Sequence, residues 1–124
     1  MRVLYVDDDR INVLLFEEAC RVAQGLDVAC AGSGAEALEM AREFQPELLV
    51  LDLHLPDTDG YALLPALRAA AGNVEAPAFL CTADEMSEVQ RQARDAGFQG
   101  CWVKPVVLPM LQAELARLGW SPAA

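Results

Sequence analysis

Strand-like and helix-like segments alternate five times along this chain of 124 residues, and this alternation limits the possible fold more than any other feature. Short apolar runs predict strands at 3–6, 26–31, 48–51, 78–81 and 101–103. A strand that is followed by a helix and a second parallel strand crosses over with one hand, so such repeats build a parallel sheet with helices on both faces. Five repeats are too few for a closed eight-stranded barrel. We therefore expect an open, doubly wound α/β sheet.

Each predicted helix is marked by apolar residues three or four positions apart. These residues are Ile11, Leu14, Leu15, Ala19 and Val22; Ala37, Leu38, Ala41 and Phe44; Met86, Val89, Ala93 and Ala96; and Leu108, Leu111, Leu115 and Leu118. The second helix begins at the capping box Ser33-Gly34-Ala35-Glu36 and ends before Pro46. A third helix is predicted at about 60–71, although Pro65 fits the first turn of a helix better than a later one. The stripe of the fourth helix is weak, which indicates a loosely held element.

Composition excludes several classes of function. The chain has nineteen acidic and nine basic residues, a formal net charge of −10, and a surface this acidic repels nucleic acid. No apolar run approaches the roughly 20 residues that span a bilayer, and the first residues lack a signal-peptide pattern. We therefore expect a cytoplasmic protein without membrane insertion or nucleic-acid binding. We expect one domain over residues 1–120 and a C-terminal tail over residues 121–124.

The cysteines Cys20, Cys30, Cys81 and Cys101 have no C-x-x-C spacing and lie far apart in the sequence. In a cytosolic chain, such cysteines are expected to be small packing residues rather than disulfides or zinc ligands. A redox-sensing role for Cys101 is the alternative, and we favour packing.

Polar side chains follow four of the five predicted strands. Asp7, Asp8 and Asp9 follow the first strand, Asp52 ends the third, Thr82 ends the fourth and Lys104 ends the fifth. The carboxyl ends of parallel strands meet at one edge of an open sheet, which is where ligands bind. Three carboxylates brought together repel one another, and a divalent cation removes that conflict. Because Mg²⁺ prefers carboxylates, waters and phosphate oxygens, the grouping predicts metal-assisted phosphate chemistry.

The residue types at this edge suit phosphoryl transfer. A carboxylate can attack phosphorus and form an acyl phosphate, and the transfer depends on positioning and on neutralising the equatorial oxygens. Lys104 can neutralise one oxygen and the metal another, while the Thr82 hydroxyl can donate a hydrogen bond to a third. Asp9 and Asp59 are instead expected to cap helices.

At these residues the sequence resembles the receiver domain of two-component response regulators. The matching motifs are Val6-Asp7-Asp8, Asp52-Leu53-His54-Leu55-Pro56-Asp57-Thr58-Asp59-Gly60, Thr82-Ala83 and Lys104-Pro105. They occur in the family's order and at its spacing, across residues 1 to about 118. The resemblance implies a flavodoxin-like (βα)5 fold with strand order 2-1-3-4-5.

The resemblance also implies roles for single residues. Asp52 is the phospho-acceptor, and Mg²⁺ is held by Asp7, Asp8, Asp52 and the backbone carbonyl of His54. Thr82 is the switch hydroxyl and Lys104 the phosphate-binding cation, with a cis bond to Pro105. The His54 side chain, Asp84, Cys101 and Pro105 are expected to tune the site or take part in switching.

Two positions depart from the family pattern. Cys101 stands three residues before the lysine, where the family usually has a Tyr or Phe that swings inward on activation, and Trp102 follows it. Val106 stands after the Lys-Pro pair, where Phe is common. We expect either a remodelled switch or a domain that passes phosphoryl groups on without a strong conformational output.

The resemblance implies a signalling switch or phosphorelay carrier that catalyses only its own phosphorylation and dephosphorylation. Its phosphoryl donor is a histidine kinase or phosphotransfer protein, or a small donor such as acetyl phosphate. The fourth helix, fifth strand and fifth helix form the family's usual partner and dimer face, so the resemblance makes this face the place where a partner or, in a homodimer, a second copy would bind. Alternatives are an excised domain of a hybrid kinase, a receiver-like binding module that is never phosphorylated, and an aspartyl phosphohydrolase. Such hydrolases place a second aspartate two residues after the nucleophile, where this chain has His54.

Overall fold

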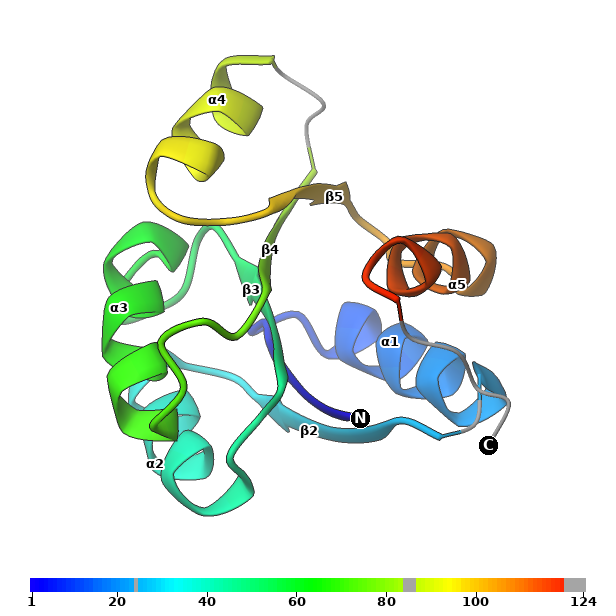
Figure 1. The fold of residues 1–124 in the computed structure, drawn as a ribbon, viewed down its shortest axis with the longest axis horizontal. Coiled ribbons are helices and arrows are strands. Elements are labelled where there is room, and N and C mark those ends of the chain that lie inside the picture. The colour runs from blue at the N-terminus through cyan, green and yellow to red at the C-terminus, as the bar shows by residue number, and fades with distance from the viewer. Residues whose placement is uncertain (24, 84–86, 120–124) are drawn as a thin grey trace.

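Five strands form one sheet with helices on both of its faces (Figure 1). The computed structural model describes residues 1–23, 25–83 and 87–119. Along these residues the elements are β1 (Arg2–Val6), α1 (Arg10–Ala23), β2 (Asp27–Ala31), α2 (Gly34–Phe44), β3 (Leu48–Asp52), α3 (Gly60–Ala71), β4 (Ala78–Thr82), α4 (Ser87–Asp95), β5 (Gly100–Val103) and α5 (Leu108–Arg117). The alternation of strand and helix that the sequence predicts is therefore confirmed.

The strands lie in the order β2-β1-β3-β4-β5, and every neighbouring pair is parallel. This is the order that the resemblance implies. The direction in which the chain adds strands reverses between β1 and β3, where Val6 pairs with Leu51. The next residues along these two strands, Asp7 and Asp52, therefore lie side by side at the carboxyl edge of the sheet, where open α/β sheets bind their ligands.

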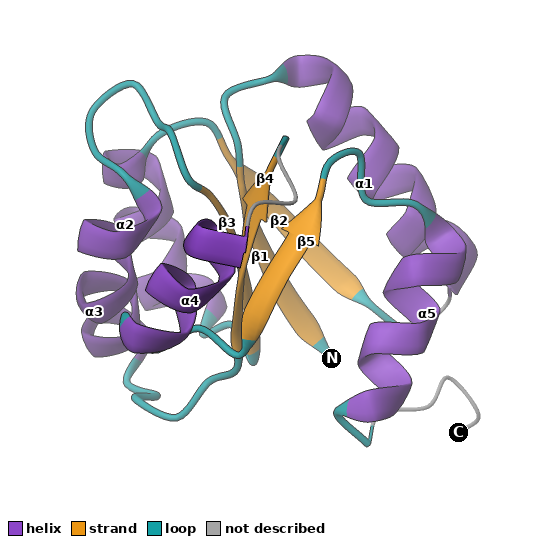
Figure 2. Cartoon of the chain, turned by 90° about the horizontal axis from the view of Figure 1, so that it is seen from above, coloured by secondary structure: helices purple, strands orange, loops and turns teal. Residues whose placement is uncertain are grey.

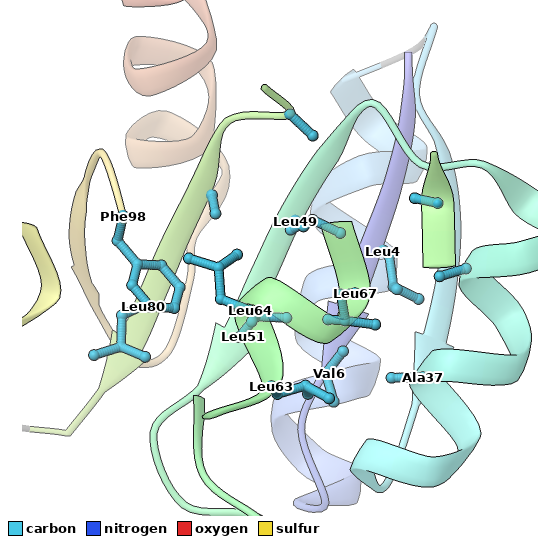
Figure 3. Packing of buried hydrophobic residues seen from close by; sticks show 14 of the residues in the cluster. Leu4, Val6, Ala37, Leu49, Leu51, Leu63, Leu64, Leu67, Leu80 and Phe98 are labelled. Atoms are coloured by element: carbon cyan, nitrogen blue, oxygen red, sulfur yellow. The ribbon is translucent and has the colours of Figure 1, made fainter. Parts of the chain in front are cut away.

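Two layers of helices enclose the sheet, with α1 and α5 on one face and α2, α3 and α4 on the other (Figures 1 and 2). Successive residues of a strand point to opposite faces, so the core divides into two clusters. Val3, Tyr5, Leu48 and Val50 belong to one cluster. Leu4, Val6, Leu49 and Leu51 belong to the other, which is the cluster drawn in Figure 3. Every residue of β3 and β4 is buried, as expected for central parallel strands covered on both faces.

The apolar residues that predict α1 mostly face solvent. Ile11, Leu14, Leu15 and Val22 are exposed, and of the five only Ala19 is buried. The buried side of the helix consists of Phe16, Ala19, Cys20 and Ala23. The spacing therefore predicts the helix correctly but not the side that packs, because two apolar stripes run next to each other. No helix in the described ranges, α1 included, is both long and apolar enough to cross a membrane.

The fourth helix makes few buried contacts, in agreement with its weak apolar stripe. Among the described side chains of α4, Ala93 is fully buried and Val89 is partly buried against the core. Met86, which belongs to the predicted stripe, lies outside the described residues. The α4 side of the molecule is therefore held by less apolar surface than the α3 side.

All four cysteines are free, as expected for packing residues. Cys20 and Cys81 are buried, while Cys30 and Cys101 are partly buried. Burial raises the pKa of the Cys20 and Cys30 thiols to about 12. These thiols are therefore protonated at neutral pH, and a protonated thiol is a poor nucleophile.

Leu64 and Leu14 offer a matched test of this packing, because both are helical leucines with opposite exposure. Leu64 on α3 is fully buried, whereas the Leu14 side chain is 50% exposed. Leu64→Ala should lower the free energy of unfolding by about 2–5 kcal/mol because it leaves a cavity in the core. Leu14→Ala should cost less than about 1 kcal/mol. Urea unfolding of both variants measures the difference, and equal losses would contradict the packing described here.

Candidate functional site

Three carboxylates come together where β1 and β3 end. Asp7, Asp8 and Asp52 each offer an oxygen, and these atoms all lie within 4.8 Å of one another. Asp7 and Asp52 are 1% and 6% exposed, while Asp8 is exposed, so the cluster opens to solvent on the Asp8 side. Oxygen donors grouped in this way fit a hard divalent cation such as Mg²⁺.

Lys104 brings a positive charge to two of these carboxylates. Its Nζ lies 3.1 Å from Asp52 Oδ1 and 3.5 Å from Asp7 Oδ2. The side chain of Lys104 is mostly buried, so this contact is poorly screened by solvent. The peptide bond between Lys104 and Pro105 is cis, as the resemblance implies, and Pro105 itself is exposed.

Thr82 lies at the end of β4, between the strand that carries Asp52 and the strand that precedes Lys104. The residue is buried, and its backbone carbonyl accepts a hydrogen bond of 2.8 Å from the Lys104 N–H. The end of β4 therefore places the hydroxyl-bearing residue next to the lysine in the sheet. Asp84, which we expect to tune the site, lies outside the described residues.

Burial and charge oppose each other within the cluster. Burial raises the pKa of Asp52, the hydrogen bond from Lys104 lowers it, and the charge of Asp7 raises it, with a net rise. Burial lowers the pKa of Lys104, but its contacts with Asp52 and Asp7 raise it by more, so the amine stays protonated. One ammonium does not offset the cost of two buried carboxylates. A bound cation would favour the ionised form of Asp52, so the charges present fit a metal.

Tyr5 is part of this site and was not predicted from the sequence. Its O–H donates to Asp7 Oδ2 at 2.9 Å, and the Asp9 N–H donates to Asp7 Oδ1 at 2.9 Å. The Tyr5 ring is buried and stacks on Phe16, with centroids 4.2 Å apart. Burial raises the pKa of Tyr5, so the hydroxyl remains a donor. A signal was present in the sequence, because residues two apart on a strand face the same side and Tyr5 precedes Asp7 by two.

The loop that follows Asp52 returns tightly onto itself. Gly60 N–H donates to the Leu53 carbonyl at 3.0 Å, and His54 forms an isolated bridge with Asp59. A Cβ on Gly60 would lie 2.9 Å from the Asp52 carbonyl oxygen, so only glycine fits there. The His54 side chain is exposed, which suits the tuning role expected of it.

Asp9 and Asp59 cap helices, as predicted. Asp9 Oδ1 accepts hydrogen bonds of 2.9 Å from the Ile11 N–H and 3.4 Å from the Asn12 N–H at the start of α1. Asp59 Oδ1 accepts a bond of 2.8 Å from the Ala62 N–H at the start of α3. Both carboxylates therefore satisfy backbone donors that a helix end leaves unpaired.

Cys101 and Trp102 point to opposite faces of β5. Cys101 Sγ lies 3.8 Å from the Val89 carbonyl oxygen of α4, to which it donates. Trp102 is buried on the other face, where it stacks on Phe79 with ring centroids 4.5 Å apart. Trp102 therefore cannot stand in for the aromatic residue that the family usually has at the position of Cys101. Burial raises the pKa of Cys101, which favours the packing role over a redox role.

Comparison with known proteins identifies the class to which this fold and site belong. The family model described as the response regulator receiver domain matches residues 3–116. This match covers β2 to β5 completely and all but one residue each of β1 and α5. The chain therefore belongs to the family of response regulator receiver domains, as the sequence motifs indicate.

Relatives in this family differ in length. The transcriptional regulatory protein PrrA of Mycobacterium tuberculosis is 38% identical over 117 residues, which are 94% of this chain and 49% of PrrA. The polar-differentiation response regulator DivK of Brucella abortus is 30% identical over 107 residues, 86% of each protein. The chain thus spans about half the length of PrrA and most of DivK.

Solved structures of receiver domains share this fold closely. The chemotaxis protein CheY4 of Vibrio cholerae superposes with a TM-score of 0.84 at 26% identity, over 94% of this chain and 96% of CheY4. The receiver domain of the sensor histidine kinase PA1611 of Pseudomonas aeruginosa has a TM-score of 0.80 at 26% identity, over 94% of each chain. The PA1611 structure is described with a magnesium ion coordinated in its active-site cleft.

Removal of the Tyr5 hydroxyl should weaken the site without altering the ring packing. Tyr5→Phe deprives the buried Asp7 carboxylate of a donor, so we expect a loss of about 1–2 kcal/mol in the free energy of unfolding. Tyr61 provides the control, because its hydroxyl donates a long hydrogen bond of 3.4 Å to Gln92 at the surface. Tyr61→Phe should cost less than about 0.5 kcal/mol. Equal values in urea unfolding would show that the Tyr5 hydroxyl contributes nothing specific.

Neutralising Asp52 should stabilise the metal-free protein at pH 7. Because burial raises the pKa of Asp52 in the folded state, folding favours the protonated carboxyl. The stability contributed by Asp52 is therefore full below the unfolded pKa of about 3.9 and is lost as the pH rises through the folded pKa. The asparagine side chain does not ionise, so Asp52→Asn does not lose this stability. We therefore expect its free energy of unfolding at pH 7 to exceed that of the wild type by about 1 kcal/mol.

Urea unfolding in EDTA between pH 4 and pH 8 measures this effect. The exposed Asp27 on β2 provides a control with the same change of residue, and Asp27→Asn should change the free energy of unfolding at pH 7 by less than about 0.5 kcal/mol. A less stable Asp52→Asn at pH 7 would mean that the ion pair with Lys104 outweighs the cost of burying the carboxylate.

Proposed function

We propose that this receiver domain accepts a phosphoryl group on Asp52 with the help of Mg²⁺, in a two-component signalling or phosphorelay pathway. The observation that carries the proposal is the position of Lys104 Nζ, 3.1 Å from Asp52 Oδ1, at the edge where Asp7 and Asp8 also lie. The carboxylate that would attack phosphorus thus lies beside an ammonium group that can neutralise phosphoryl oxygens. Both lie next to further carboxylates of the kind that bind Mg²⁺.

Mg²⁺ would be held by Asp7, Asp8, Asp52 and the backbone carbonyl of His54. When bound, it supplies positive charge that offsets the carboxylates and the phosphoryl oxygens. Oxygen donors of this kind suit Mg²⁺ better than the His54 imidazole does. The magnesium ion described in the cleft of the PA1611 receiver domain supports this assignment.

The residues of the chain supply the other requirements of the transfer. A carboxylate oxygen of Asp52 attacks phosphorus, and the bond from phosphorus to the donor nitrogen or oxygen breaks, leaving an acyl phosphate and the freed donor. Lys104 neutralises a phosphoryl oxygen, and the Thr82 hydroxyl donates to another. The exposed Asp8 side of the cluster leaves room for the donor, beside a cavity of about 400 Å³ that Asp7 and Asp8 help to line.

We assign the phosphoryl donor to a histidine kinase or a phosphotransfer protein, with the domain acting in the cytoplasm through protein contacts. DivK, which this chain matches over most of its length, is named a response regulator and supports such a role. The dimer face would consist of α4, β5 and α5, which border a cavity of about 340 Å³. Near this face Val107 is 49% exposed, whereas Val106 is buried.

A second candidate is a receiver-like module that binds partners without being phosphorylated. Cys101 favours it, because the aromatic residue that usually reports phosphorylation in this family is replaced there. Asp52, Lys104 and the two aspartates after β1 argue against it, since a module that has lost phosphorylation has no need of them.

Intact-mass analysis after incubation with acetyl phosphate and Mg²⁺ tests the proposal. The wild type should gain one phosphoryl group, whereas Asp52→Asn and wild type in EDTA should gain none. Lys104→Met, which removes the cation but keeps the length of the side chain, should slow the gain by about a hundredfold or more, the scale of one lost electrostatic contact. Asp27→Asn should match the wild type. If neither acetyl phosphate nor a panel of histidine kinases labels the wild type, the binding module replaces the phospho-acceptor.

A further inference from the structure

Asp57 joins the loop after β3 to the first turn of α2. Asp57 Oδ1 accepts a hydrogen bond of 2.8 Å from the Gly34 N–H, and Oδ2 accepts one of 3.0 Å from the Ala35 N–H. These donors hold the pKa of Asp57 below its usual range. Both are backbone groups that the start of a helix leaves unpaired, so the carboxylate also meets the positive end of the helix dipole.

The loop after β3 and the first turn of α2 also fit each other in shape. A Cβ added to Gly34 would lie 2.6 Å from Thr58 Cγ2 and 3.3 Å from Asp57 Oδ1. The absence of a side chain at Gly34 therefore lets the loop approach the helix closely enough for Asp57 to reach both N–H groups. Asp57 and Gly34 lie 23 residues apart in the sequence, so this contact belongs to the tertiary structure.

The clamped loop is the one that carries His54. Its inner end is fixed to the sheet, because the Leu53 N–H donates to the Cys81 carbonyl at 3.1 Å. Within the loop, the Leu55 N–H donates to the Thr58 carbonyl at 3.1 Å, so a shift of Thr58 is passed toward His54. Asp57 holds the outer end of this short segment against α2, which lies beside α3 (Figures 1 and 2).

We propose that Asp57 is a positioning residue for the metal site, which fixes the His54 carbonyl by clamping its loop to the N-terminus of α2. The inference rests on the proposed function, in which that carbonyl is a ligand of Mg²⁺. Groups that hold metal ligands in place typically change metal affinity by 10- to 100-fold when they are removed. Asp57 is not a ligand in this scheme and acts through the loop alone.

If Asp57 did no more than cap α2, a different result would be expected. Ser33 distinguishes this capping role from the positioning role. Ser33 Oγ accepts a hydrogen bond of 3.2 Å from the Glu36 N–H, so it also caps α2. Ser33 contributes no such bond to the loop after β3. Ser33→Ala should therefore destabilise the helix start and leave Mg²⁺ affinity within about twofold of the wild type.

Titration of the full chain with MgCl₂, followed by two-dimensional amide NMR, tests the proposal and reports the fold of each variant. Asp57→Asn should weaken Mg²⁺ binding about tenfold. Gly34→Ala should do the same without any change of charge, because the new methyl group pushes Thr58 away. Gly34→Ala combined with Thr58→Ser, which removes the opposing methyl group, should recover most of the lost affinity.

Affinities of Asp57→Asn and Gly34→Ala equal to that of the wild type would overturn the proposal. So would a Ser33→Ala variant that is weakened as much as Asp57→Asn, because the effect would then come from helix stability. If Gly34→Ala does not fold, the comparison of Asp57→Asn with Ser33→Ala decides the question alone. A wild type that binds no Mg²⁺ would refute both this inference and the proposed metal, whereas tight wild-type binding with unchanged variants refutes the inference only.

Discussion

The candidate site depends on one electrostatic arrangement, in which the Lys104 ammonium is held between the carboxylates of Asp7 and Asp52 at the carboxyl edge of the sheet. Two buried carboxylates in contact are costly, and one cation offsets that cost only in part. The rest of the fold makes the arrangement tolerable. Five parallel strands fix the three residues in place, the Tyr5 hydroxyl donates to Asp7, and two layers of apolar side chains supply the stability that the charged edge lacks.

Such an edge is poor for stability and well suited to phosphate chemistry. The same burial that raises the pKa of Asp52 also strengthens the attraction between its carboxylate and any cation that reaches it, because few waters compete there. Tyr5 is fixed by its stack on Phe16, so Asp7 is oriented before a ligand arrives. Preorganisation of this kind lowers the cost of binding, since the side chains lose little freedom when the ligand enters.

Local patterns in the sequence were sufficient to predict the alternation of strand and helix and which polar side chains meet at the edge of the sheet, whereas the strand order was implied by the family resemblance. Alternating periodicity predicts the (βα)5 order, and polar residues at strand ends predict which side chains meet. The packed side of α1 was not predictable, since Phe16 and Cys20 form a second apolar stripe beside Leu14 and Leu15. The clamp made by Asp57 was hidden for a different reason. It joins residues far apart in the chain, and its partners are backbone N–H groups, which every residue except proline carries.

Under the proposed function, the unequal exposure of the three aspartates would affect how fast different phosphoryl donors react. Asp7 and Asp52 are buried while Asp8 faces solvent, so a donor approaches through a negative potential that the net charge of −10 reinforces. Long-range attraction speeds the encounter with a positively charged protein surface, and long-range repulsion slows the encounter with a small anion. Added salt screens both effects, and the two kinds of donor then encounter the domain at more similar rates. Under the proposed function, the charge of the domain would therefore favour a donor with a positively charged surface over a small anionic donor at low ionic strength.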